Sequence, residues 1–162
     1  MNNLMVKNAG PEDRNLLFEG LIRTIQELKI DLDDPYLDFI PEAAERDCRE
    51  RVKEFFAKPD HQLLIAWSGD QPAGLAAGWA EKPFVPFSKI RRIARLELCW
   101  VYPKFRQKGA ASLLANAFEA WAKTKGIEWI ELSYMAGNQV AHFVWESNGF
   151  GPYRIIARKK IE

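Results

Sequence analysis

The stretch with the clearest chemical potential runs from Val101 to Ala111 and reads Val-Tyr-Pro-Lys-Phe-Arg-Gln-Lys-Gly-Ala-Ala. An apolar, strand-like segment precedes it and an amphipathic, helix-like segment follows it, so a strand feeds a short loop that opens a helix. The first backbone N–H groups of such a helix have no partner inside it and lie at its positive end. Gly109 has no Cβ and lets a ligand approach the backbone closely. The stretch therefore predicts an anion site, suited best to a phosphate or pyrophosphate.

Two widespread phosphate motifs do not occur in this stretch. It is not a Walker loop, because there is no Gly-x-x-x-x-Gly-Lys-Ser/Thr, and it is not the dinucleotide fingerprint, because there is no Gly-x-Gly-x-x-Gly. A plain β–α turn with solvated Arg106 and Lys108 would explain the same residues. Local chemistry leaves both interpretations open.

Two blocks of the sequence together resemble one family. Arg106-x-x-Gly109-x-Ala111 is similar to the Arg/Gln-x-x-Gly-x-Gly/Ala signature of the GNAT superfamily of N-acetyltransferases, and Leu98-x-x-Val101-x-Pro103 is similar to its fourth strand. The block from Asn138 to Phe150 resembles the next one, in the family's order and separation. The resemblance implies that the loop holds the pyrophosphate of coenzyme A and that acetyl-CoA is the co-substrate.

The resemblance also implies which positions contact the coenzyme. Backbone groups of the fourth strand, at Cys99, Trp100 and Val101, would pair with the pantetheine arm like an added strand. Asn138 would contact the same arm while it caps a helix. The pyrophosphate positions are Arg106, Gln107, Lys108, Gly109, Ala110 and Ala111.

Trp145 departs from the family pattern. Many members carry a tyrosine there that protonates the leaving thiolate, whereas an indole N–H donates a hydrogen bond but is not a usable acid. The indole could hydrogen-bond the thiolate or pack against the cofactor. Tyr134 and Tyr153 are alternative acids, although a core role explains each of them better.

Glu97 is the candidate general base. Two-residue alternation predicts that it shares a strand face with Cys99 and Val101, near the thioester if this strand is splayed from its neighbour as in the family. An acid on an apolar strand must be paired, solvated or functional, so an ion pair with Arg92 or Arg95 is an equal alternative. Cys99 is a poor covalent nucleophile, since free cysteines on strands are usually buried filler.

The pattern of apolar residues predicts a single domain over residues 1–162, a mixed, layered α/β fold. Strands are expected at Leu4–Asn8, Gln62–Trp67, Pro72–Ala80, Arg91–Val101, Ile127–Tyr134 and Tyr153–Lys160. Helices are expected from Gly10 to Lys29, Pro41 to Ala57, Ser112 to Lys125 and Asn138 to Ser147. The order equals that of the GNAT fold, which implies a mostly antiparallel central sheet, helices on both faces, and a splay between the fourth and fifth strands.

The composition limits the classes of partner molecule that we expect. The formal charge is +1, which argues against nucleic acid and anionic membranes, and no apolar run approaches a membrane span. The two cysteines have no paired spacing and no metal-ligating pattern is seen, so we expect a cytoplasmic protein without a metal. Eight acidic residues between Glu27 and Asp47 could attract a cationic amine or could simply be solvated.

These observations favour an acetyl-CoA-dependent N-acetyltransferase. It would act on a primary amine of a small molecule or a protein, by direct attack in a ternary complex. The alternative is a non-catalytic acyl-CoA-binding module, motivated by Trp145. The third hypothesis is a nucleic-acid-directed acetyltransferase, for instance one that acts on the amine of a charged tRNA, although the near-neutral charge argues against it. A homodimer is an open expectation, since dimers are common in such families.

Overall fold

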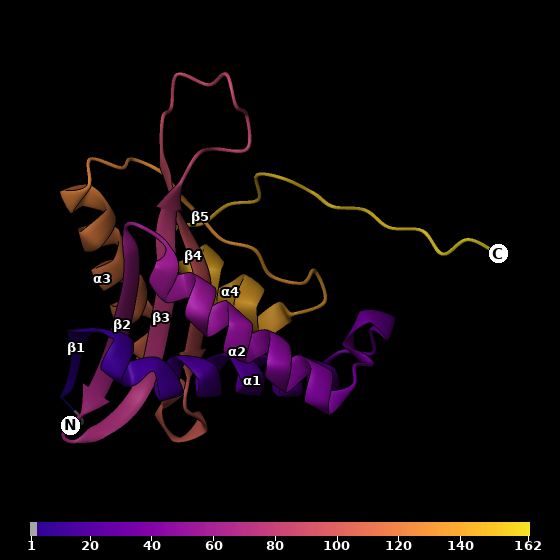
Figure 1. Cartoon of the computed structure of the whole chain (residues 1–162), viewed down its shortest axis with the longest axis horizontal. Coiled ribbons are helices and arrows are strands. Elements are labelled where there is room, and N and C mark those ends of the chain that lie inside the picture. Colours follow the sequence, from indigo (N-terminus) through magenta and orange to yellow (C-terminus); the bar gives the residue numbers. More distant parts are fainter. Residues whose placement is uncertain (1–2) are drawn as a thin grey trace.

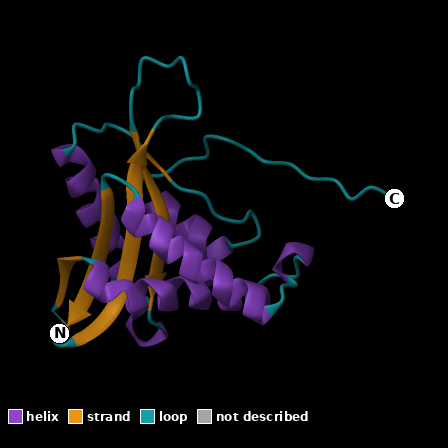
Figure 2. Cartoon of the chain, viewed as in Figure 1, coloured by secondary structure: helices purple, strands orange, loops and turns teal. Residues whose placement is uncertain are grey.

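The computed structural model describes residues 3–162, and its centre is one five-stranded mixed sheet (Figures 1 and 2). The strands lie in sequence order, and each of the first four is antiparallel to its neighbour. The fifth is parallel to the fourth. The strands are β1 (Leu4–Ala9), β2 (His61–Ser68), β3 (Gln71–Glu81), β4 (Ile93–Val101) and β5 (Ile130–Glu131).

Helices cover both faces of the sheet, as the fold prediction required. One face packs against α1 (Arg14–Asp31) and α2 (Pro41–Ala57) through a core that includes Leu17, Phe55 and Leu98. The other packs against α3 (Ala110–Thr124) and α4 (Gln139–Ser147) through a core that includes Phe118 and Trp145. The first four strands and all four helices are thus confirmed, with small differences at their ends.

An irregularity interrupts β4 at Glu97. Leu98 pairs with Ala77 and Leu96 pairs with Gly78, so Glu97 is an extra residue, left without a partner on β3. Such a bulge breaks the alternation of side chains between the two faces. Leu98 and Trp100 pack on the α1/α2 side, whereas Leu96 and Cys99 pack on the α3/α4 side.

The sheet opens between β4 and β5. The two strands pair only at Ala94 with Ile130 and at Arg95 with Glu131. The predicted strand Ile127–Tyr134 is therefore much shorter in the structure. Beyond Arg95, the β5-facing edge of β4 has no strand beside it among the described residues, which is the splay that the family resemblance implied.

The last predicted strand, Tyr153–Lys160, is wrong. Residues 151–162 run as an extended segment away from the body of the molecule and pair with no described strand (Figure 1). A strand needs an edge to pair with, and this segment lies away from the sheet. Among the described residues, no helix is both long enough and apolar enough to cross a membrane.

Candidate functional site

The loop that joins β4 to α3 combines two left-handed residues with the start of a helix. After a short 3-10 turn at Pro103–Phe105, Gln107 has φ 58° and Gly109 has φ 80°, and α3 begins at Ala110. A Cβ at Gly109 would meet no heavy atom within 4 Å. Glycine is therefore favoured there by the positive φ and not by lack of space.

Several backbone N–H groups of this loop are free. The N–H groups of Phe105 and Arg106 donate within the 3-10 turn, and that of Leu113 donates to the carbonyl of Gly109. Between them, the N–H groups of residues 107–112 donate to no described residue. They lie at the positive end of α3, so the loop has the donors that a phosphate or pyrophosphate needs.

The cations of the loop are held by other groups. The Arg106 guanidinium donates two hydrogen bonds of 2.7 Å to the Glu27 carboxylate and one of 2.9 Å to the Val101 carbonyl. Lys108 Nζ donates to the Lys104 carbonyl at 2.7 Å. Both residues lie in the loop as the sequence predicted, but Arg106 is turned toward α1, and the free donors are backbone amides.

The free edge of β4 lies directly before this loop. Cys99, Trp100 and Val101 follow the two residues that pair with β5, so their edge has no strand beside it among the described residues. Trp100 is buried and its indole Nε1 lies 3.3 Å from Glu27 Oε1. The open edge and the free amides lie on either side of the short 3-10 turn at Pro103–Phe105, so a long, thin ligand could contact both.

Cys99 does not have the properties of a nucleophile. Burial raises the pKa of its thiol to about 12. The thiolate, which is the reactive form, is therefore scarce at neutral pH. The expectation that Cys99 is not a covalent nucleophile agrees with this environment.

Glu97 lies on a different face from the one that alternation predicted. Cys99 and Val101 pack against the α3/α4 core, but the charges that act on Glu97 include Arg51 of α2 and Lys58, which follows the last residue of α2. The bulge is the reason, because it shifts the alternation by one residue at Glu97 itself. Glu97 is an exposed residue, but partial removal of its carboxyl from water raises its pKa, and Arg51 and Arg95 only partly oppose this effect. No salt bridge joins Glu97 to Arg92 or Arg95, which are paired with Asp60, Glu81 and Glu131 instead.

Trp145 and Asn138 both belong to α4. Trp145 is buried in the α3/α4 core, where its ring packs edge-on against Phe150 at a centroid distance of 5.5 Å. Asn138 caps α4, since its Oδ1 accepts a 3.0 Å hydrogen bond from the Ala141 N–H. The structure therefore assigns a packing role to the first residue and a capping role to the second.

Tyr134 is not a core residue. It is exposed, and its hydroxyl lies 3.0 Å from Nδ1 of His142 on α4. Nε2 of His142 lies 3.8 Å from the Glu146 carboxylate. Tyr153, the other alternative acid, lies in the extended final segment and is also exposed.

Acidic residues of α1 contact side chains at this loop, and the sequence analysis did not predict these contacts. The Tyr102 hydroxyl donates a 2.8 Å hydrogen bond to Glu19, and burial, together with this contact, raises the pKa of Tyr102 to about 12. Tyr102 also packs edge-on against Trp100 at 4.4 Å. Glu19 and Glu27 are far from the loop in sequence, and no motif links them, so only the packing of α1 could reveal these contacts.

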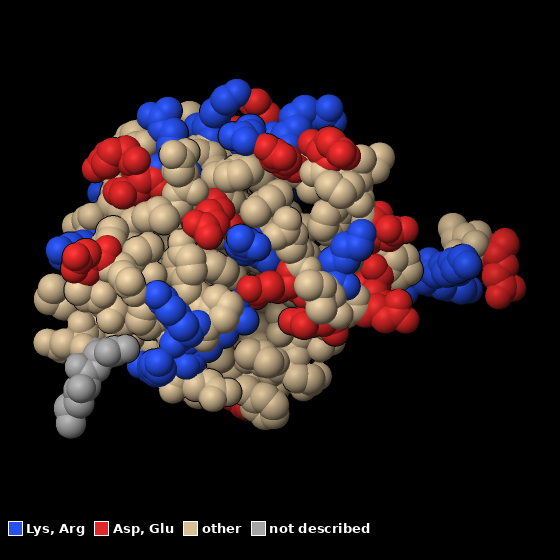
Figure 3. Space-filling view, turned by 90° about the horizontal axis from the view of Figure 1, so that it is seen from below, with Lys and Arg blue, Asp and Glu red and all other residues tan. Residues whose placement is uncertain are grey.

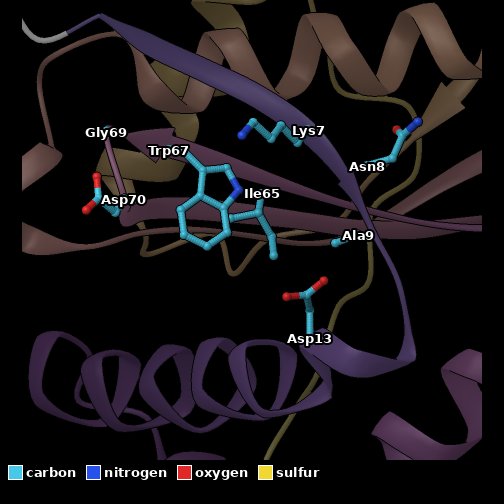
Figure 4. Close-up of a pocket in the computed structure, with 8 residues that line it drawn as sticks. All are labelled: Lys7, Asn8, Ala9, Asp13, Ile65, Trp67, Gly69 and Asp70. Carbon is cyan, nitrogen blue, oxygen red and sulfur yellow. The ribbon is translucent and has the colours of Figure 1, made fainter.

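A shallow hollow is lined by residues outside this site. It has a volume of about 290 Å³ and lies between β1, β2 and the start of α1, with Asp13 and Asp70 at opposite sides of Trp67 (Figure 4). Its lining contains none of the predicted site residues. Within residues 3–162, no group of three or more histidine, cysteine, aspartate or glutamate side chains could hold a metal ion.

Comparison with known families gives one match over most of the chain. A model of the acetyltransferase (GNAT) family matches residues 25–150. A curated relative, tRNA(Met) cytidine acetyltransferase TmcA 2 from Saccharolobus solfataricus, is 36% identical over 75 residues. That segment is 45% of this chain but only 9% of the much longer relative.

Solved structures share the whole fold at low identity. The aminoglycoside N-acetyltransferase AAC(6')-Iy in complex with CoA has a TM-score of 0.71 and 19% identity, over 98% of this chain and 95% of that one. The aminoglycoside 6'-N-acetyltransferase AAC(6')-IG from Acinetobacter haemolyticus has a TM-score of 0.69 and 20% identity, over 98% and 99%. Identity this low indicates a shared fold.

Proposed function

Because the chain belongs to the GNAT family of acetyltransferases, we propose that it transfers the acetyl group of acetyl-CoA to a primary amine, by direct attack in a ternary complex. The observation that carries the proposal is the run of free N–H groups at residues 107–112, beside the free edge of β4. These groups fit a pyrophosphate followed by an extended amide-bearing arm. Acetyl-CoA would supply an activated acetyl thioester.

The chain's own residues would hold this co-substrate mainly through the backbone. Amides of Gln107, Lys108, Gly109, Ala110 and Ala111 would bind the pyrophosphate at the positive end of α3. Backbone groups of Cys99, Trp100 and Val101 would pair with the pantetheine arm. Arg106 would orient the loop through Glu27, and Asn138 and Trp145 would line the far side of the opening from α4.

Glu97 would act as the general base, directly or through water. It lies on the α1/α2 side of β4, and its raised pKa makes it a better proton acceptor than an ordinary carboxylate. The high pKa of Cys99 favours direct transfer over a cysteine-bound intermediate. The buried indole of Trp145 can only donate a hydrogen bond to a leaving thiolate. Tyr134, whose exposed hydroxyl pairs with His142, would be the alternative acid.

Thermal unfolding with acetyl-CoA, followed by an assay of CoA thiol release, tests the proposal. At about 100 times the dissociation constant, binding adds ~2.7 kcal/mol, which corresponds to a rise of roughly 5–10 °C in the midpoint. Thiol release should then require an amine, and a panel should include polyamines, aminoglycosides and peptide amines. No shift with saturating acetyl-CoA would overturn the proposal.

The non-catalytic alternative predicts a different pair of results. An acyl-CoA-binding module would give the thermal shift, but no amine in the panel would increase thiol release above buffer hydrolysis. This alternative is supported by Trp145, a buried residue that stands in place of an acid and cannot protonate a thiolate.

The similarity to the tRNA(Met) cytidine acetyltransferase supports a second candidate acceptor, an amine on RNA. The charge distribution supports it less well. On the face shown in Figure 3, lysine and arginine side chains lie in separate groups with acidic side chains between them, and they form no continuous basic stripe. RNA binding that weakens steeply with salt, together with acetyl transfer to RNA, would favour this acceptor over a small amine.

A further inference from the structure

The Glu27 carboxylate of α1 is occupied by a cation of the same chain. Both of its oxygens accept hydrogen bonds of 2.7 Å from the Arg106 guanidinium, and its Oε1 lies 3.3 Å from the Trp100 indole nitrogen. α1 crosses the sheet at the end of β4, beside the loop that leads to α3 (Figure 1). Glu27 therefore contacts both the proposed coenzyme loop and a buried residue of β4, and its position already accommodates one cationic group.

The contact between Glu27 and Arg106 is exposed enough to exchange. The two side chains are 33% and 43% exposed, so water reaches both charged groups, and an ion pair of this kind is weak. The arginine has a second anchor, since its Nε donates to the Val101 carbonyl at 2.9 Å. This anchor can keep the side chain in the loop while the rest of the guanidinium changes its partner.

The loop offers the same guanidinium a second anion. Arg106 directly precedes the free N–H groups of residues 107–112, where the proposed pyrophosphate would lie. A guanidinium binds phosphate oxygens in the same forked manner as carboxylate oxygens, and a pyrophosphate carries more negative charge than one carboxylate. The two anions therefore compete for one cation.

We propose, on the basis of the function proposed above, that Arg106 is a switch between these two anions. In the free chain it pairs with Glu27 and orients the loop. When acetyl-CoA binds, the guanidinium moves to the pyrophosphate and leaves the carboxylate open beside the Trp100 indole. The open carboxylate then binds an ammonium group of the acceptor, so acetyl-CoA and the acceptor bind with positive coupling.

The group that Glu27 binds differs from the amine that is acetylated. An amine attacks a thioester only without its proton, whereas a nearby carboxylate stabilises the protonated form. Distance leads to the same conclusion, because Glu97, the proposed base, lies roughly 13 Å before Val101 along β4 at ~3.3 Å per residue. The acceptor class is therefore a long amine that carries a second cationic group near its other end.

Affinity for acetyl-CoA tests the switch, and Glu27→Gln is the key variant. Removal of the competing carboxylate should strengthen acetyl-CoA binding by about 3- to 5-fold, which is the range expected for release of an exposed ion pair. Asp31→Asn is the matched control, because it removes the same charge from an exposed residue one turn further along α1. Screening by salt should keep its effect on the affinity below about 2-fold.

A double-mutant cycle separates the switch from a fixed contact. The gain from Glu27→Gln should disappear in the Arg106→Ala background, because no guanidinium is then left to change partners. If the pair were a fixed support of the loop, Glu27→Gln would weaken acetyl-CoA binding or leave it unchanged, and either result would overturn the proposal. A gain that persists with Arg106→Ala would also overturn it. A wild type that binds no acetyl-CoA would instead overturn the proposed function itself.

Steady-state kinetics tests the acceptor subsite. Octylamine and the diaminooctane with an amine at each end differ only in the second ammonium group. The wild type should accept the diamine at least ~10-fold better in kcat/KM, and Glu27→Gln should remove this preference by raising the KM for the diamine with kcat unchanged.

Equal values of kcat/KM for the two amines in the wild type would overturn the subsite, and so would a preference that survives in Glu27→Gln. A wild type that acetylates only amines with a single cationic group would overturn it as well. No turnover with any amine, despite binding of acetyl-CoA, would overturn the subsite together with the proposed transfer reaction.

Discussion

β4 and β5 are neighbours in one sheet but differ in how much of each strand is paired. β4 pairs with β3 along almost its whole length, and the bulge at Glu97 is its one irregularity in the register. β5 pairs with β4 at two residues and has no described strand on its other side. The well-paired half of the sheet, β1 to β4, therefore holds its side chains in fixed positions. The poorly paired half, around β5, leaves backbone N–H and C=O groups unpaired, and these can bind other chains or ligands.

The proposed acetyl transfer lies where the well-paired part of the sheet, which ends with β4, meets the poorly paired β5. The loop of residues 106–109 extends from the paired strand, so its free amides are anchored by a buried core. The opening beside it exists because β5 diverges after Glu131. A site for a long, flexible ligand needs a rigid binding surface and an opening through which the ligand enters. Here β4 and its loop form the rigid surface, and the separation of β5 from β4 forms the opening.

The largest expected effect tests the rigidity of the paired half. Phe118 is fully buried against β3 and β4, so Phe118→Ala should lower the free energy of unfolding by about 3–5 kcal/mol. Trp129→Ala, beside β5, removes a larger but exposed side chain and should cost less than about 1 kcal/mol. Urea unfolding of both variants checks the contrast. Similar losses would show that the two halves are equally well packed.

The second effect concerns the loop itself. Gly109→Val should weaken acetyl-CoA binding at least ~100-fold, equivalent to about 2.7 kcal/mol, because a side chain at φ 80° strains the turn and blocks approach to the amides. Gly126→Val is the matched control, since Gly126 has φ 67°, also has open space around it, and lies just past the other end of α3. Titration calorimetry should show intact binding in the control. Equal losses of affinity would mean that backbone strain alone is responsible.

Much of this boundary could be predicted from the sequence. The loop from Val101 to Ala111 carries a local motif, and the helices follow from apolar periodicity, so both were found from residues close in the chain. Glu97 was placed on the wrong face because a bulge is decided by the register between two strands, which a single strand does not reveal. The ion pair of Arg106 with Glu27 depends on how α1 packs across β4.

The final segment shows a different limit. The β propensity of Tyr153, Ile155 and Ile156 led to the prediction of a strand, but in the structure the segment is extended and unpaired. Pairing, however, depends on an available edge, and within the chain the segment is held elsewhere by Arg154 and Arg158. Local propensity describes the segment but not its partner.

A smaller effect is expected from the cation of the loop. Arg106 is tied to Glu27 and the Val101 carbonyl, so Arg106→Ala should weaken acetyl-CoA binding by less than about 10-fold, or ~1.4 kcal/mol. The exposed pair should contribute no more than about 1 kcal/mol to stability. Titration calorimetry of Arg106→Ala and Gly109→Val under the same conditions compares their affinities for acetyl-CoA directly. A loss as large as that of Gly109→Val would move the main binding role from the amides to the guanidinium.

The smallest effect is a pH-dependent gain in stability at the bulge. Partial removal of its carboxyl from water raises the pKa of Glu97 in the folded chain above its ordinary value of 4.5, so the folded state binds a proton more tightly than the unfolded state does. The stability that the protonated carboxyl contributes is complete below that ordinary value and is lost as the pH rises through the raised pKa. Glutamine cannot ionise, so Glu97→Gln should gain stability relative to the wild type between about pH 4 and pH 7.

Urea unfolding of both proteins at these two pH values measures the difference. If Glu97 is also the base, the same variant should be the more stable protein at neutral pH and the less active one. A carboxylate kept at a cost in stability would then explain why β4, paired so regularly elsewhere, is irregular at this residue. A gain that is larger at the lower pH would contradict the raised pKa, and unchanged turnover at all pH values would remove the base role.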